Sequence, residues 1–156
     1  MTADLPQRDA IRDFYDAYYA SLDDCDLVAW PALFTEDCLY RVIPRENYEA
    51  GRTLCTMQAE SRGMLMDRVA GLQGTQVYAP RSYRRFPGPL RLTPDPAGTR
   101  CRHNLLIVQT LLDRQADIVL VGACHDLLVN EGGLRLRERI VVFDSEMVPN
   151  SLIFPA

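Results

Sequence analysis

The sequence contains no lysine, so all 17 of its basic residues are arginines. An arginine guanidinium group binds a carboxylate through two parallel hydrogen bonds, which a lysine ammonium group cannot do. Two explanations remain open: selection for such contacts, or codon bias in a GC-rich genome. The 21 acidic residues outnumber the arginines and give a formal net charge of −4. This balance argues against a protein that binds the nucleic-acid backbone, which would show a basic excess.

Cysteine motifs and long apolar runs are absent as well. No CxxC pair occurs, and no apolar run approaches the ~20 residues that a membrane-spanning helix needs. No signal peptide is visible at the N-terminus. These absences predict a cytoplasmic protein without a membrane segment, with reduced thiols. The cysteines are odd in number and widely spaced: Cys25, Cys38, Cys55, Cys101 and Cys124.

Nucleotide and serine-hydrolase motifs are missing too, since the chain has no P-loop, no GxGxxG and no GxSxG. Its 156 residues suit one domain, and no linker long enough to divide them is present. We therefore predict a single domain over residues 1–156.

The apolar spacing in the first part of the chain predicts helices. A short helix is expected after Asp26, although Pro31 would delay or distort its start. A third helix is expected after Gly51, with apolar positions from Leu54 to Leu72 at helical spacing. The opening helix has the most regular apolar stripe: Ile11, Phe14, Tyr15, Tyr18 and Leu22.

The residue pattern in the rest of the chain predicts mainly strands. Cys38–Ile43 is β-like, and Tyr78–Gly98 reads as a strand fragment followed by a proline-rich loop. His103–Leu112, Ile118–Val129 and a segment from Leu134 follow as three strands, the last two joined by a glycine-containing hairpin loop. Helices first and long antiparallel strands afterwards indicate an α+β fold, with a curved sheet wrapped on helices.

Two Cys/His pairs require a test for iron. Cys101 and His103 match half of a Rieske ligand set, which needs two cysteines on one iron and two histidines on the other. The second pair would be Cys124 and His125, but neighbouring strand residues point to opposite faces. We therefore expect no cluster. A mononuclear iron site would need both histidines and a carboxylate; two strands could bring the histidines together, but two separate, hydrogen-bonded histidines are favoured.

An acid–base pocket is the alternative chemistry. Glu138 is a candidate base because an inward carboxylate would have a raised pKa, and His125 is a second pocket candidate. The favoured alternative is that Glu138 is a structural carboxylate, paired with an arginine at the open end of the cone that the curved sheet would form. On the expected alternation, Glu138 shares a strand face with Leu134, Leu136, Ile140 and Val142.

The opposite face of the same strand is expected to carry a row of three arginines, Arg135, Arg137 and Arg139. Like charges on alternate residues repel unless an acidic group faces them. A solvated face is one interpretation of the row. An acidic patch on a partner subunit is the other.

Three segments have a pattern in common with one protein family. They are residues 30–47, with WPALFTEDCLY followed by PREN, residues 66–72, MDRVAGL, and residues 134–155. Together they resemble the small (beta) subunits of bacterial aromatic-ring-hydroxylating oxygenases, and the last segment is most similar to the salicylate 5-hydroxylase and terephthalate dioxygenase branch. The resemblance spans nearly the whole chain. One departure is YRRF at residues 83–86, where many members have a histidine after the arginines.

The resemblance implies a cone-shaped fold of the nuclear-transport-factor and ketosteroid-isomerase type. It also implies a non-catalytic, structural subunit without metal or cofactor of its own, working in the degradation of aromatic compounds and of aromatic carboxylates in particular. The large (alpha) subunit would carry the Rieske [2Fe-2S] cluster and the mononuclear iron. Three large and three small subunits would associate, and a reductase or ferredoxin would deliver electrons to the complex.

The expected contacts with the large subunit lie in two regions. One is the segment after the first strand, and the other is the last strand with its apolar tail, residues 152–155. A stand-alone dehydratase or isomerase, and a cone-shaped ligand-binding or oligomerising protein, remain as alternatives. The candidate interface residues are Arg45, Glu46, Asn47, Arg135, Arg137, Arg139 and Phe154.

Overall fold

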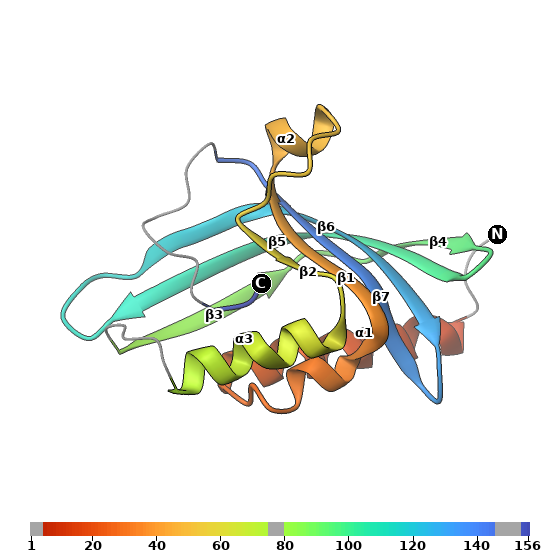
Figure 1. The fold of residues 1–156 in the computed structure, drawn as a ribbon, viewed down its shortest axis with the longest axis horizontal. Helices are drawn as coiled ribbons and strands as arrows, with labels where there is room; N and C mark the ends of the chain where they lie inside the picture. The colour runs from red at the N-terminus through yellow and green to blue at the C-terminus, as the bar shows by residue number, and fades with distance from the viewer. Residues whose placement is uncertain (1–4, 75–79, 146–153) are drawn as a thin grey trace.

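The computed structural model describes residues 5–74, 80–145 and 154–156 (Figure 1). Its elements in chain order are α1 (Leu5–Asp23), the 3-10 helix η1 (Trp30–Leu33), β1 (Phe34–Pro44), α2 (Arg45–Glu49), β2 (Met57–Ala59), α3 (Arg62–Gly74), β3 (Arg81–Pro87), β4 (Arg91–Asp95), β5 (Gly98–Leu111), β6 (Asp117–Asn130) and β7 (Leu134–Phe143).

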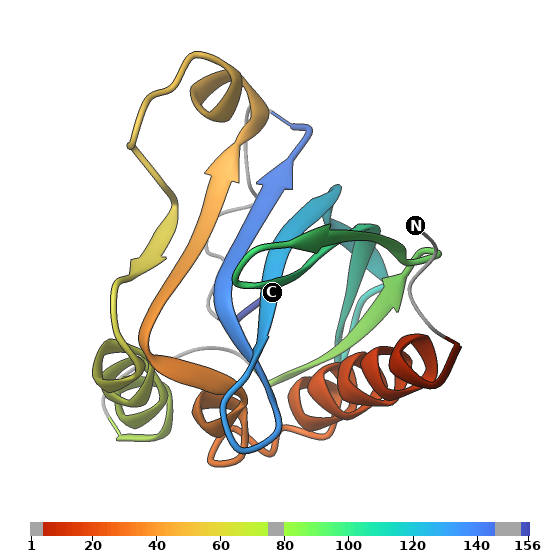
Figure 2. The ribbon, with the colours of Figure 1, turned by 90° about the vertical axis from the view of Figure 1, so that its right-hand side faces the viewer.

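The seven strands form one strongly curved sheet. The strand order in the sheet is β2-β1-β7-β6-β5-β3, and β4 pairs with the first residues of β5, from Gly98 to Arg102. Neighbouring strands run antiparallel except β1 and β7, which are parallel and far apart in the sequence. Helices α1 and α3 lie on the concave side, whereas α2 projects on the opposite side (Figures 1 and 2). The predicted α+β fold, with a curved sheet wrapped on helices, is confirmed.

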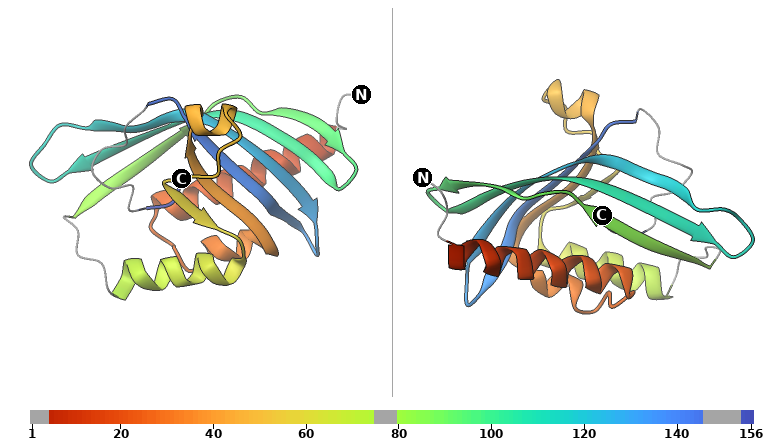
Figure 3. Two further views of the ribbon diagram at one scale, coloured as in Figure 1. Left: turned by 45° about the horizontal axis from the view of Figure 1, so that its top comes forward. Right: turned by 180° about the vertical axis from the view of Figure 1, so that it is seen from behind.

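The helices α1 and α3 lie below the concave side of the sheet (Figure 3), and buried side chains from these helices, η1 and the sheet form the core. The predicted first helix is confirmed, and its apolar stripe, Ile11, Phe14, Tyr15, Tyr18 and Leu22, is buried. The predicted short helix is the single turn η1, with Pro31 in its first turn, where a missing N–H costs nothing.

The third helix was predicted to begin too early. Residues Met57 and Ala59 form strand β2, opposite Val42 and Tyr40 of β1, and α3 begins only at Arg62. The helical spacing between residues 54 and 64 was coincidental, because pairing with the edge of the sheet overrides so short a periodicity. The rest of the predicted helix is confirmed.

The proline-rich region forms two strands where we expected one strand and a loop. Strand β3 pairs with one half of β5 and β4 with the other half. Pro94 is tolerated because β4 has a single strand neighbour, so its missing N–H can face away from the ladder. Tyr78, where the expected strand began, lies outside the described residues.

A β-bulge in β7 contradicts the expected alternation of its side chains. Opposite β6, Leu127 pairs with Glu138 but Leu128 pairs with Leu136, so Arg137 is an extra residue. The bulge places both Leu136 and Arg139 on the concave side, where each is fully buried. The prediction of an exposed Arg139 is therefore wrong, and so is that of an inward Glu138.

Candidate functional site

The concave side of the sheet holds a fully buried ion pair. Arg139 of β7 and Asp126 of β6 are direct neighbours across the strands, and the Arg139 Nη1 atom lies 2.8 Å from the Asp126 Oδ2 atom. The Arg139 Nη2 atom donates to the Tyr19 hydroxyl over 2.8 Å, and its guanidinium carbon lies 4.3 Å from the centroid of the Tyr18 ring. Helix α1 therefore supplies the aromatic groups that enclose the pair.

Two tyrosines of α1 extend this network to β5 and β6. The Tyr15 hydroxyl donates to the Asp126 Oδ2 atom over 2.7 Å, and the Tyr19 oxygen lies 2.5 Å from the His103 Nε2 atom. The Tyr19 hydroxyl accepts a hydrogen bond from Arg139 and has a second lone pair and a proton of its own, so either neutral tautomer of His103 fits the contact at Nε2. The Nδ1 atom of His103 is buried and has no hydrogen-bond partner in the described structure.

Burial sets the protonation states of this network. Burial, and secondarily the charge of Arg139, lowers the pKa of His103 to about 3, so the imidazole is neutral at pH 7. Burial also raises the pKa of Tyr15 and Tyr19 well above their usual values. Burial raises the pKa of Asp126, and the Arg139 charge counteracts that rise. The network can therefore donate hydrogen bonds, but an imidazolium acid is not available near neutral pH.

The last residues of the chain close the concave side next to Arg139. The Tyr18 hydroxyl donates to the Ala156 carbonyl over 2.7 Å, and the Ala156 amide donates to the Tyr40 hydroxyl over 2.9 Å. The Arg85 guanidinium donates to the Pro155 carbonyl over 2.6 Å. Helix α1, β1 and β3 thus hold this short segment together.

Phe154 belongs to the chain's own core, which corrects its prediction as a surface contact for a partner. Its ring is only 6% exposed, and its centroid lies 5.0 Å from that of Tyr83. The expectation rested on the cost of leaving an apolar tail in water, and the concave side of the sheet removes that cost. The neighbouring Leu152 and Ile153 lie outside the described residues.

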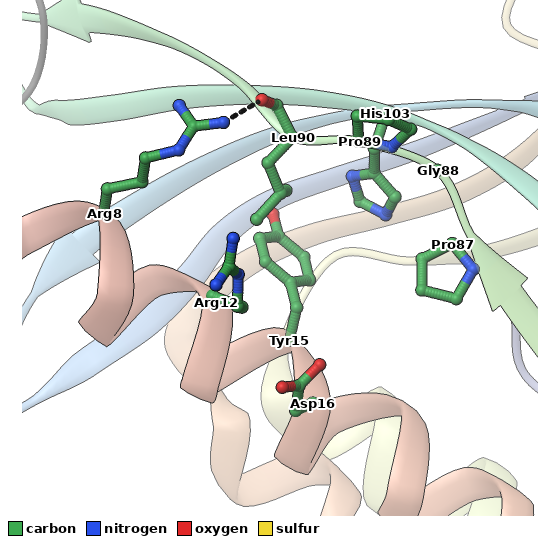
Figure 4. A pocket seen from close by; sticks show the side chains of 9 residues that line it. All are labelled: Arg8, Arg12, Tyr15, Asp16, Pro87, Gly88, Pro89, Leu90 and His103. Carbon is green, nitrogen blue, oxygen red and sulfur yellow. Dashed lines mark hydrogen bonds between the residues drawn. The ribbon is translucent and has the colours of Figure 1, made fainter.

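A cavity of about 250 Å³ lies between α1 and the connection from β3 to β4 (Figure 4). His103 and Tyr15 form its inner wall, and their rings lie 4.8 Å apart. Apolar side chains come from the connection, and charged ones come from α1. The remaining lining residues are Arg8, Arg12, Asp16, Pro87, Gly88, Pro89 and Leu90.

The Cys/His pairs do not fit an iron cluster. Cys124 is fully buried on the concave side, whereas His125 lies on the outer side and stacks on Tyr48 of α2 with ring centroids 5.3 Å apart. His103 uses its Nε2 atom for Tyr19. In the described parts of the chain, no three His, Cys, Asp or Glu side chains gather as metal ligands would.

The two pocket candidates of the sequence are not brought together with the buried network. Glu138 lies on the outer side and pairs with Arg100, whose Nη1 atom is 2.5 Å from the Glu138 Oε2 atom. This is the arginine-paired alternative. His125 is half-buried on the outer side, where burial and, to a lesser extent, Arg102 lower its pKa. Asp126 is the inward carboxylate that sequence reasoning missed, although its place in the apolar run of β6 was a visible signal.

The outer side of the sheet carries an exposed apolar row that crosses three strands. Phe86 of β3, Leu106 of β5 and Val121 of β6 are direct cross-strand neighbours. Phe86 is 56% exposed and Val121 45% exposed. We call these three residues the outer apolar row. A hollow of about 440 Å³ beside the row is also lined by Arg45, Arg102 and Asp144.

The remaining interface candidates lie at the surface. Arg45 and Glu46 are exposed on α2, Asn47 is half-buried, and Arg45 pairs with Asp144 next to the outer apolar row. Arg135 and Arg137 are half-buried beside the hairpin between β6 and β7. Arg135 donates to the carbonyls of Ala32 and Glu131, and Arg137 pairs with Glu131 over 2.8 Å.

Among the described helices, none combines the length and the apolar character that spanning a bilayer requires.

Comparison with known proteins places the chain in a family. The small subunit of anthranilate 1,2-dioxygenase from Burkholderia cepacia is 29% identical, over 99% of this chain and 98% of that protein. The terminal oxygenase subunit beta 1 of terephthalate 1,2-dioxygenase from a Comamonas species is 29% identical, over 93% of this chain and 96% of that protein. A crystal structure assigned as the beta subunit of an aromatic-ring-hydroxylating dioxygenase from Novosphingobium aromaticivorans is 32% identical and covers 98% of this chain and 100% of its own, with a TM-score of 0.87. The family model for the ring hydroxylating beta subunit matches residues 17–150, so the chain belongs to the ring hydroxylating beta subunit family.

Proposed function

We propose that this chain is the non-catalytic, structural subunit of a Rieske non-heme iron oxygenase that hydroxylates aromatic rings, and that the outer side of its sheet docks on the large subunit. The observation that carries the docking proposal is the outer apolar row. An apolar row open to water on a sheet face is typical of a surface that a protein partner covers.

The surroundings of the row support a protein partner. Aromatic and aliphatic side chains at the centre with arginines around them are the composition of protein interfaces. Phe86 would be the central aromatic anchor, while Arg45 and Arg102 beside the hollow would meet acidic groups at its rim. The α2 residues Glu46 and Asn47 continue this rim.

The oxidative chemistry would belong to the large subunit, which would hold the Rieske [2Fe-2S] cluster and the mononuclear iron. Three large and three small subunits would assemble in the cytoplasm and receive electrons from a reductase or ferredoxin. The names of the relatives, which act on anthranilate and terephthalate, favour an aromatic carboxylate as substrate.

The test is co-expression of this chain with the large subunit of a ring-hydroxylating oxygenase, which is sought among the neighbouring reading frames by its C-x-H and C-x-x-H motifs. Phe86→Glu and Val121→Glu each place a charge in the outer apolar row and should reduce co-purification at least tenfold. The matched control is Val28→Glu, because Val28 is 74% exposed in the loop after α1. Folding of each variant is checked by circular dichroism. Equal co-purification of all three well-folded variants would show that the docking surface lies elsewhere.

A further inference from the structure

We propose that the cavity between α1 and the β3–β4 connection binds a small aromatic carboxylate. The cavity opens on the side of α1, whereas the outer apolar row lies on the other side of the sheet, and the hollow beside that row shares Pro87 and Gly88 with the cavity wall. The inference does not depend on the proposed function.

The inner wall of the cavity carries a buried ring nitrogen that has no hydrogen-bond partner in the described structure. This nitrogen is the Nδ1 atom of His103, whose side chain is almost fully buried. Buried polar atoms in proteins normally have a hydrogen-bond partner, so a polar ligand atom beside this wall would satisfy the nitrogen.

The mouth of the cavity attracts an anion. Arg8 and Arg12 stand on α1 at one side of the cavity, and His103 lies at the other (Figure 4). Arg8 is held over the cavity because it donates to the Leu90 carbonyl over 2.9 Å. Arg12 is exposed and makes no hydrogen bond or ion pair with the described residues. Asp16 is the single acidic lining residue, so the two arginines leave the mouth with a net positive charge.

The walls between the two ends are suited to a flat ring. Pro87, Pro89 and Leu90 line one side, and the Tyr15 ring lines the other. Drug-sized ligands occupy pockets of about 300–1,000 Å³, so a cavity of about 250 Å³ suits a single-ring molecule. We assign the carboxylate to Arg12 and Arg8, the ring to the apolar walls, and a polar substituent, where present, to the end of the cavity formed by His103.

The chain's two histidines allow a direct test by NMR. The full-length chain is labelled with ¹⁵N in histidine and titrated with 4-hydroxybenzoate and with benzoate. We expect saturable shifts of the His103 ring signals with both ligands and none at His125, which lies on the other side of the sheet. Arg12→Gln should weaken binding of both about tenfold or more, since one charged hydrogen bond contributes about 1.5–3 kcal/mol. Benzamide, the neutral analogue of benzoate, should bind the unaltered chain correspondingly more weakly.

Arg84→Gln is the matched control, because Arg84 is an exposed arginine on the outer side of the sheet and should leave the affinity unchanged. The proposal is overturned if neither acid shifts the His103 signals, or if Arg12→Gln and Arg84→Gln bind alike. It is also overturned if inorganic phosphate competes as well as benzoate does, because the arginines would then be a general anion-binding surface.

Discussion

Arg139 connects more of the interior than any sequence pattern indicated, since it contacts Asp126, Tyr19, Tyr18 and the Ala156 carbonyl. Removing one partner of a buried ion pair leaves the other charge without compensation and costs about 3–5 kcal/mol. We therefore expect Arg139→Met to lower the free energy of unfolding by about that amount, measured by urea denaturation.

Arg137→Met is the control for this prediction. Arg137 stands two residues away, but its pair with Glu131 is partly exposed, and such pairs contribute about 1 kcal/mol or less. Adding Asp126→Leu to Arg139→Met should restore part of the lost stability, because it removes the unpaired carboxylate. Equal losses for the two arginine variants would contradict a special role for Arg139.

The burial of His103 leads to a prediction about how the free energy of unfolding depends on pH. Its pKa is about 3 in the folded chain and near 6.5 in the unfolded chain. Between these values the unfolded chain binds a proton that the folded chain does not, so the free energy of unfolding falls as the pH falls from about 6.5 toward 3. The His103 NMR signals should not titrate between pH 8 and 4. His103→Gln should make the unfolding free energy less dependent on pH in this window, and an unchanged pH dependence would exclude this linkage.

At the scale of elements, the C-terminal segment should stabilise the fold it closes. Phe154→Ala removes a nearly fully buried ring from its contact with Tyr83 and should lower the free energy of unfolding by about 3 kcal/mol. Leu112→Ala should change it by no more than about 0.5 kcal/mol, because Leu112 is 88% exposed. Similar urea midpoints for the two variants would mean that the segment contributes little.

The sequence predicted elements well where one periodicity ran for several turns, and poorly where a local irregularity intervened. Helix α1 and the pair β5–β6 follow regular patterns and were found. The bulge at Arg137 shifts the alternation of β7 by one residue, so the side chains after it lie on the side of the sheet opposite to the expected one. No residue type in the strand indicates such a bulge. The expected arginine row and the inward placement of Glu138 failed for this single reason, whereas the favoured interpretation of Glu138 as an arginine-paired structural carboxylate is confirmed.

The site could be predicted only in part, because its members come from distant elements. The inward Asp126 was detectable as a carboxylate in an apolar strand, but its partners stand on α1 and β7. The separation of Cys124 from His125 was predicted correctly from strand alternation alone. The outer apolar row depends on the register between three strands, which a single sequence does not specify.

At the scale of the whole molecule, the two sides of the sheet divide its roles. The concave side is filled by the helices, the Arg139 network and the C-terminal segment, whereas the outer side keeps apolar residues in water. Under the proposed function, the outer side would dock on the large subunit, and ring hydroxylation would take place in that subunit.

The most direct test separates the two subunits and recombines them. The small chain, the large subunit and their complex are each purified, and iron per chain and oxygen consumption are measured with a panel of aromatic carboxylates. The account predicts iron in the large subunit and in the complex, with turnover by the complex, and neither iron nor turnover in the small chain alone. Stoichiometric iron in the isolated small chain, or hydroxylation by it without a partner, would contradict the account.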